Sequence, residues 1–205
     1  MRLKVLGAYG SADATHNLTG YLIDDRVAVD AGTLGSKLTL LQQSKIEMIF
    51  VTHVHADHIR DLPVLIENRC HSDAPPLEII AAKDVMEMLH NDVFNGKVWP
   101  DFETFPSPQT GKPAVRYRAL APGRRTEING VGLTTVAVDH SIPAAGIIVD
   151  IGGQAIAFTG DTGPTKAIWK KINKTSGIVA MVSEAEDRIW LTSPYFVVTA
   201  SGRVL

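Results

Sequence analysis

The sequence predicts an α/β protein that contains two sheets and outer helices. Short apolar segments rich in β-branched residues recur along the chain, and turn residues separate them, which is the pattern of buried strands. Stretches with the apolar spacing of helices lie between several of these segments. In the second half the order is strands first, then a helix, then another strand, which is typical of sheets covered by helices.

The first half of the chain alternates strand patterns with helix patterns. Strands are predicted at residues 3–7, 20–23, 27–30, 46–51 and 77–81. Asp24-Asp25-Arg26 separates the second strand from the third, which indicates a hairpin. Helices are predicted at residues 37–43, 59–68 and 84–90. Ser36 is the expected cap of the first helix, and Pro63 lies near the start of the second.

Residues 95–126 lack a regular pattern and contain several prolines. This segment fits either a surface lid or a plain connection between two halves of one fold. Strands resume at residues 132–138, 146–151 and 155–159, followed by a helix at 165–172 and a strand at 177–183.

The composition is that of a globular protein of ordinary size. The chain has 205 residues, 45% apolar and 20% charged, which predicts a single domain over residues 1–205 with an atypical tail from about residue 187. The net charge of −2 provides no bulk attraction to nucleic acid or to an anionic membrane. Cys70 is the single cysteine, which excludes an intramolecular disulfide. Without a signal-peptide pattern or a long apolar stretch, we expect a cytoplasmic protein with no membrane partner; a homodimer is compatible with the sequence.

The strongest functional signal directly follows the strand predicted at residues 46–51. His53, His55, Asp57 and His58 supply imidazole and carboxylate groups, which are the ligands that zinc favours in catalytic sites. Side chains at positions i and i+2 of an extended segment point the same way, so His53 and His55 can hold one ion. The turn that follows can bring Asp57 and His58 to a second ion. The chain has seven histidines, so three of them within this run indicate a metal site.

Two further candidate ligands also follow predicted strands. His140 comes shortly after the strand at residues 132–138, and Asp161 comes shortly after the strand at 155–159. Taken alone, a single His or a Gly-Asp pair is more often structural. Their position at strand ends, in sequence order after the first cluster, favours metal ligation for both.

The His-x-His-x-Asp-His run, the later single His and the Gly-Asp-Thr together resemble the metallo-β-lactamase superfamily. Asp30-Ala31-Gly32 resembles the Asp-x-Gly turn that usually precedes the metal motif in that family. The resemblance covers roughly residues 1–186 and implies a four-layer αββα sandwich with metals at the edge between the two sheets. It implies two zinc ions, the first held by His53, His55 and His140, the second by Asp57 and His58, with Asp161 bridging both.

Metal ligands alone do not name the substrate, because two ions about 3.5–4 Å apart can activate water against phosphodiesters, thioesters or lactams. The bridging role implied for Asp161 resembles the phosphodiesterase, ribonuclease Z and glyoxalase II branches more than the lactamases. Residues 6–11, 17–19 and 57–62 most resemble bacterial class II cyclic-nucleotide phosphodiesterases.

We therefore expect hydrolysis of a small-molecule 3′,5′-cyclic nucleotide, cyclic AMP or cyclic GMP, to the 5′-nucleotide. The attacking group would be a metal-bridging hydroxide, with Asp57 as the catalytic residue that orients it or takes its proton. The main alternative is a ribonuclease Z-like endonuclease that processes tRNA 3′ ends. Ala56 stands where that branch usually has Gly, and no basic, Gly-rich arm is evident, so nucleic acid is the less favoured substrate. A thioesterase is the third choice.

The sequence departs from the family pattern near its end. The family normally has a further His ligand for the second metal, but no histidine follows His140. We therefore expect a second zinc site that binds weakly, and manganese or iron would suit the same ligands. This departure leaves open a non-catalytic protein that binds metal or nucleotide with an incomplete second site.

Overall fold

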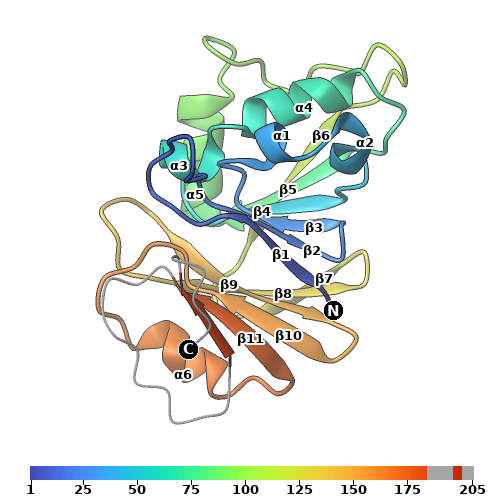
Figure 1. Cartoon of the computed structure of the whole chain (residues 1–205). Helices are drawn as coiled ribbons and strands as arrows, with labels where there is room; N and C mark the ends of the chain where they lie inside the picture. The colour runs from blue at the N-terminus through green and yellow to red at the C-terminus, as the bar shows by residue number, and fades with distance from the viewer. Residues whose placement is uncertain (184–195, 200–205) are drawn as a thin grey trace. The chain divides into compact units, whose positions relative to one another are not determined.

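The computed structural model describes residues 1–183 and 196–199 (Figure 1). The chain divides into two compact units, one of residues 2–119 and one of Met1 with the residues from 120 onward. Each unit contains one six-stranded sheet and at least one helix. Among the helices that the structure describes, none combines the length and the apolar character needed to cross a bilayer. The prediction of a single domain over residues 1–205 stays a prediction.

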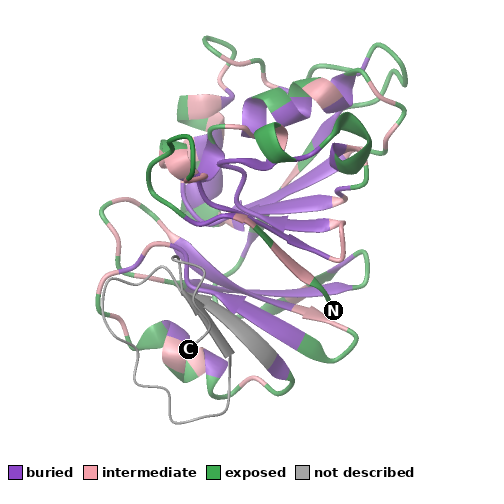
Figure 2. Cartoon of the chain, viewed as in Figure 1, coloured by how far each residue is buried: buried purple, intermediate pink, exposed green. Residues whose placement is uncertain are grey.

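The sheet of the amino-terminal unit has the strand order β1-β2-β3-β4-β5-β6. Its strands are β1 (Leu3–Gly7), β2 (Gly20–Ile23), β3 (Val27–Val29), β4 (Met48–Val51), β5 (Leu77–Ala82) and β6 (Val115–Leu120). β1, β2 and β3 pair antiparallel, whereas β4 pairs parallel with both β3 and β5. Every residue of β2, β3 and β4 is buried, which is typical of strands covered on both faces (Figure 2).

Six short helical segments accompany this sheet. They are α1 (Leu34–Lys37), α2 (Leu40–Gln43), α3 (Ala56–Ile59), α4 (Leu62–Cys70), α5 (Lys83–Met88) and the π-helix η1 (Leu89–Val93). In α4, Leu62, Leu65, Ile66 and Arg69 are buried at positions i, i+3, i+4 and i+7, which forms one face of the helix. The leucines and the isoleucine of that face join the same apolar cluster as Ile49 of β4.

Two helices predicted as continuous are each divided. The predicted helix at residues 37–43 is confirmed over Leu40–Gln43 (α2), but it is not continuous, because the chain is extended at Leu38 and Thr39 before α2 begins. Thr39 and Gln42 form a reciprocal capping box there, so Thr39, not Ser36, is the cap. The predicted helix at residues 59–68 separates into α3 and α4. Pro63 lies in the first turn of α4, where its missing N–H costs no helical hydrogen bond.

The segment predicted as irregular, residues 95–126, contains β6 and the start of a further strand. β6 alternates apolar residues with charged ones at the end of the sheet, a pattern that the neighbouring prolines obscured. Arg118 donates to the buried carboxylate of Glu78 on β5 with an Nε–Oε2 distance of 2.5 Å, which joins the two strands. Phe102, in the same segment, is buried in the apolar cluster of this unit.

The sheet of the carboxy-terminal unit has the order β12-β11-β10-β9-β8-β7. Its strands are β7 (Arg125–Ile128), β8 (Val131–Ala137), β9 (Ala145–Ile151), β10 (Gln154–Phe158), β11 (Ile178–Ser183) and β12 (Phe196–Thr199). Helix α6 (Ala167–Ile172) packs Ile168 and Ile172 against Ile148 and Ala157 of this sheet. The predicted tail from about residue 187 lies outside the described residues except for β12, which pairs parallel with β11.

Arg69 is a buried cation that fastens the end of α4 to its surroundings. Its side chain is 4% exposed and donates to three backbone carbonyls, those of Gln43, Ser44 and Pro75. Burial lowers the pKa of Arg69 to about 10, which still leaves the guanidinium charged at neutral pH. The hydrogen bonds join α4 to the carboxyl end of α2 and to the segment before β5.

Replacing Arg69 with Met should lower the free energy of unfolding by roughly 3 kcal/mol, because it leaves buried carbonyls without a donor. Chemical denaturation followed by circular dichroism measures this change. The matched control is Arg116→Met, since the Arg116 side chain is 59% exposed and its loss should change stability by less than about 0.5 kcal/mol. Equal effects of the two substitutions would contradict the structural role of Arg69.

Candidate metal centre

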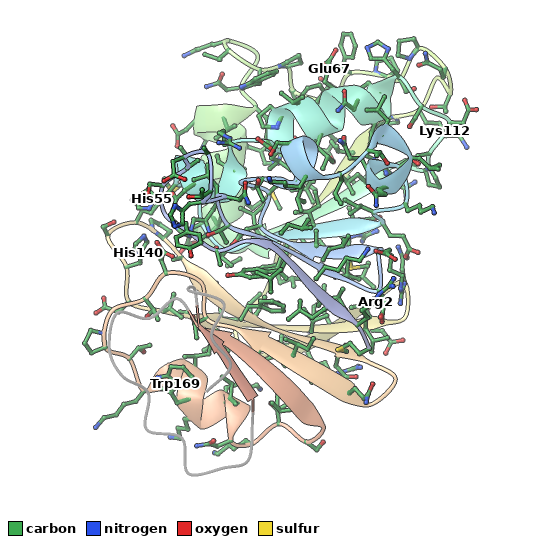
Figure 3. All side chains as sticks on the ribbon, viewed as in Figure 1. Arg2, His55, Glu67, Lys112, His140 and Trp169 are labelled. Carbon is green, nitrogen blue, oxygen red and sulfur yellow. The ribbon has the colours of Figure 1, made fainter. Side chains whose placement is uncertain are left out.

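The histidine-rich run, residues 53–58, follows strand β4 at the edge of the amino-terminal sheet. β4 lies between two parallel neighbours, and the chain leaves its carboxyl end through Thr52 and His53. His55 has an extended backbone and is the N-cap residue of α3, so the run bends into a helix at that point. The carboxyl ends of parallel strands are where α/β proteins place ligand sites. The run therefore leaves the amino-terminal sheet at the carboxyl end of β4 (Figure 3 labels His55), and its predicted place between the two sheets stays a prediction.

The four predicted ligands of this run lie close together. Nε2 of His53 and Nδ1 of His55 are 3.1 Å apart. The ring of His58 lies 4.1 Å from the ring of His53, and its Nε2 is 3.5 Å from Oδ2 of Asp57. His53 and His58 are fully buried, whereas His55 and Asp57 are partly exposed. The arrangement gathers nitrogen and carboxylate donors that a cation from solvent can reach on one side.

A buried carboxylate, that of Asp30, orients this cluster. Oδ1 of Asp30 accepts a hydrogen bond from the backbone N–H of Thr52 at 2.8 Å, and Oδ2 accepts from the Thr52 hydroxyl at 2.8 Å. Nδ1 of His58 also lies 2.8 Å from Oδ2 of Asp30. Because a carboxylate accepts this bond, Nδ1 carries the proton and Nε2 presents its lone pair. A carboxylate behind a histidine in this way is the usual support of a metal-ligating imidazole.

The backbone around Asp30 is shaped to allow these contacts. Asp30 has a φ of 57°, in the left-handed region. The backbone N–H of Ala31 donates to the carbonyl of His58 at 2.7 Å. At Gly32, a Cβ atom would lie 1.8 Å from the carbonyl oxygen of Asp57, so only glycine permits this close approach. The turn at residues 30–32 therefore holds the Asp57–His58 segment in place.

Asp30 and Thr52 were not among the candidate site residues predicted from the sequence. The signal that could have found Asp30 was present, since Asp30-Ala31-Gly32 resembles the family's Asp-x-Gly turn. Thr52 carried no comparable signal, because a threonine at a strand end has many structural roles.

The carboxy-terminal unit holds the other two predicted ligands at one sheet edge. β8 and β10 both pair antiparallel with β9, so they run in the same direction and end at the same edge. His140 follows β8 and Asp161 follows β10, and their ligand atoms lie within 4.8 Å of each other. The backbone N–H of Asp139 donates to the hydroxyl of Thr162 at 3.2 Å, and Gly163 donates to the carbonyl of Asp139 at 2.7 Å. These bonds fasten the two ligand loops together.

The chemistry of this donor set fits a divalent transition metal. Imidazole and carboxylate suit zinc, and they also accept manganese and iron. The amino-terminal unit brings together His53, His55, Asp57 and His58, and the carboxy-terminal unit brings together His140 and Asp161. That all six converge on two shared ions stays a prediction.

Comparison with known proteins gives a family and several relatives. The family described as "Beta-lactamase superfamily domain" matches residues 25–188. A ribonuclease Z of Enterococcus faecalis is 42% identical over 101 residues, which cover 43% of this chain and 32% of that protein. A probable 3′,5′-cyclic-nucleotide phosphodiesterase of Yersinia pestis is 24% identical over 164 residues, covering 71% of this chain and 46% of that protein. The chain therefore spans less than half the length of either curated relative.

Solved structures share the fold. The metallo-β-lactamase fold protein YhfI of Bacillus subtilis aligns with a TM-score of 0.67 at 20% identity, covering 88% of this chain and 70% of that one. Unliganded yeast PDE1 aligns with a TM-score of 0.72 at 14% identity, covering 88% and 74%. The short form of human tRNase Z aligns with a TM-score of 0.62 at 16% identity, covering 88% and 76%. These likenesses confirm the predicted αββα metallo-β-lactamase fold, and the family match shows that the chain belongs to the β-lactamase superfamily.

Proposed function

We propose that this chain is a metal-dependent phosphodiesterase that hydrolyses 3′,5′-cyclic nucleotides to 5′-nucleotides. The observation that carries the hydrolase part is the donor cluster His53–His58, in which Asp30 orients His58 through a buried hydrogen bond. For the substrate, the support is the relative named as a probable cyclic-nucleotide phosphodiesterase, which matches 71% of this chain.

Each of the six candidate ligands has a role in the proposed reaction. His53, His55 and His140 would hold one metal ion, Asp57 and His58 a second, and Asp161 would be shared. Bound divalent ions would polarise the phosphodiester and lower the pKa of water in the site. Asp57 would orient the attacking water and accept its proton; its position beside His58 and its partial exposure to solvent support this role. The oxygen of water bonds to phosphorus while the bond to the 3′ oxygen breaks, and the 3′ oxygen then takes up a proton.

Processing of tRNA 3′ ends is the second candidate. Its specific support is the higher identity to the E. faecalis ribonuclease Z, 42%, although over 101 residues. Both reactions break a phosphodiester bond, so the same donor set serves either one. They differ in substrate size, which can be tested directly with the purified chain.

Hydrolysis of cyclic AMP by the purified chain should depend on bound metal. We expect purified protein supplied with zinc to bind about two ions per chain by elemental analysis and to convert cyclic AMP to 5′-AMP, measured by chromatography. Removing the metal with a chelator should abolish turnover, and added zinc should restore it. His53→Ala should lower kcat/KM by at least about a thousandfold, because it removes a ligand that the reaction depends on.

The matched control is His71→Ala, because His71 is exposed and outside the cluster. Folded, metal-loaded protein that cleaves a tRNA precursor but not cyclic AMP would replace the first candidate with the second. Folded protein that binds one metal ion and hydrolyses neither substrate would instead support a binding protein.

Asp30→Asn should weaken one metal site selectively. An Asn amide can donate to Nδ1 of His58, which moves the ring proton to Nε2 and removes the lone pair that faces the metal. We expect the second ion to bind roughly 10–100-fold more weakly while the first binds as before, measured by competitive zinc titration. Asp73→Asn, at an exposed position, is the control. Unchanged affinity at both sites in Asp30→Asn would show that Asp30 does not tune a ligand.

A further inference from the structure

The connection between β1 and β2 carries an ordered group of polar and aromatic side chains that the proposed reaction does not use. This loop, residues 8–19, is fixed at its base, where the backbone N–H of Tyr9 donates to the carbonyl of Asn17 at 3.2 Å. Tyr9 and Leu18 also form an isolated β-bridge. The tip of the loop is exposed, so its order comes from local hydrogen bonds rather than from burial.

Asp13 supplies most of those bonds. Its Oδ1 accepts from the backbone N–H of Thr15 at 2.6 Å, from the Thr15 hydroxyl at 2.8 Å and from the backbone N–H of His16 at 2.8 Å. Its Oδ2 lies 2.8 Å from Nδ1 of His16. The bond to His16 is the largest of the effects that lower the pKa of Asp13, so Asp13 is a carboxylate at neutral pH. The imidazole is thereby fixed with Nδ1 towards Asp13.

Tyr9 and His16 form an exposed aromatic pair. Their ring centroids are 4.3 Å apart in an edge-to-face arrangement. Tyr9 is 38% exposed and the His16 side chain 43% exposed. Among the described residues, no hydrogen bond reaches Nε2 of His16. The pair therefore offers solvent a ring face and a hydrogen-bonding nitrogen whose orientations are already set.

The loop that carries this aromatic pair passes beside the candidate metal centre. Gly10 follows Tyr9 directly, and a Cβ atom on Gly10 would lie 3.5 Å from Oδ2 of Asp57. Consecutive Cα atoms are about 3.8 Å apart, so the backbone of Tyr9 is one residue from contact with the Asp57 carboxylate. Figure 1 shows the β1–β2 connection passing next to α3, the helix that carries Asp57. Gly10 adds no side chain that would close the space in front of this carboxylate.

We propose that Tyr9 and His16 bind the base of the nucleotide whose phosphate is hydrolysed at Asp57. This proposal rests on the proposed phosphodiesterase function and names its recognition element. The base face stacks on the Tyr9 ring, as nucleobases commonly do on exposed aromatic side chains. Nε2 of His16 forms a hydrogen bond with the edge of the base. Asp13 acts as a positioning residue, because it fixes the imidazole before substrate arrives.

The test compares two substrates that share the scissile bonds and differ only in the base. One is cyclic AMP, and the other is the methyl riboside 3′,5′-cyclic phosphate, which lacks a base. In Tyr9→Leu we expect kcat/KM for cyclic AMP to fall roughly 5–100-fold, the range of one lost stacking contact. The same variant should hydrolyse the base-free substrate within about twofold of the wild-type rate. Tyr9→Phe, which keeps the ring, should retain activity towards both substrates.

His16→Asn separates substrate contact from loop structure. The Asn amide can still donate to Asp13 but offers no group at the position of Nε2, so the selective loss should appear as a raised KM for cyclic AMP. Phe105→Leu is the control, because Phe105 is also an exposed aromatic residue of this unit but lies outside the loop. Equal losses with both substrates, or no loss with either, would overturn the recognition role.

Equilibrium binding keeps this test separate from the proposed reaction. If the wild-type chain hydrolyses neither substrate, the phosphodiesterase proposal fails, and titration with a fluorescent cyclic AMP analogue then decides the recognition proposal. Binding that weakens in Tyr9→Leu and His16→Asn but not in Phe105→Leu would support it. Absent binding, or binding that all three variants share with the wild type, would refute it.

Discussion

The buried carboxylate of Asp30 ties three parts of the amino-terminal unit together. Asp30 follows β3 and accepts hydrogen bonds from the backbone N–H and the hydroxyl of Thr52, just after β4. It also accepts a hydrogen bond from Nδ1 of His58 in α3. A carboxylate without partners in such a place would be strongly destabilising, so these hydrogen bonds and the cluster depend on one another. The orientation of His58, a candidate metal ligand, thus follows from a contact between segments more than twenty residues apart in sequence.

The two units bring their candidate donor residues to a sheet edge through different strand topologies. In the amino-terminal unit, parallel strands bring their carboxyl ends to one edge, and one continuous segment after β4, the loop with His53 and His55 followed by helix α3 with Asp57 and His58, carries four donors. In the carboxy-terminal unit, β9 separates β8 and β10, so two loops each carry one donor and hydrogen bonds join them. In both units, the direction of a strand determines the sheet edge at which the following loop begins, and therefore where the donor residues of that loop lie.

Most of the strands, and the location of the donor residues just after them, could be predicted from the sequence because both depend on local patterns; that these residues hold metal stays a prediction. Apolar runs mark β4, β8 and β10, and the first donor follows the end of each strand within three residues. The prediction of secondary structure failed where an element depends on contacts between side chains or shows only a weak sequence pattern. Thr39 divides one predicted helix by capping the next, and the strand β6 alternates arginines with apolar residues at the sheet end. Asp30 could be seen as part of a motif, but its bond to His58 joins segments that only the fold brings together.

The left-handed backbone conformation at Asp30 restricts which amino acids this position can accept. A φ of 57° favours glycine, asparagine and aspartate over all other residues. Glycine has no side chain to meet Thr52 and His58, and asparagine reverses the proton on the ring. Each of the two requirements alone would tolerate several residues, but together they leave aspartate. A library that randomises this position and selects for a loaded site would therefore return almost a single amino acid.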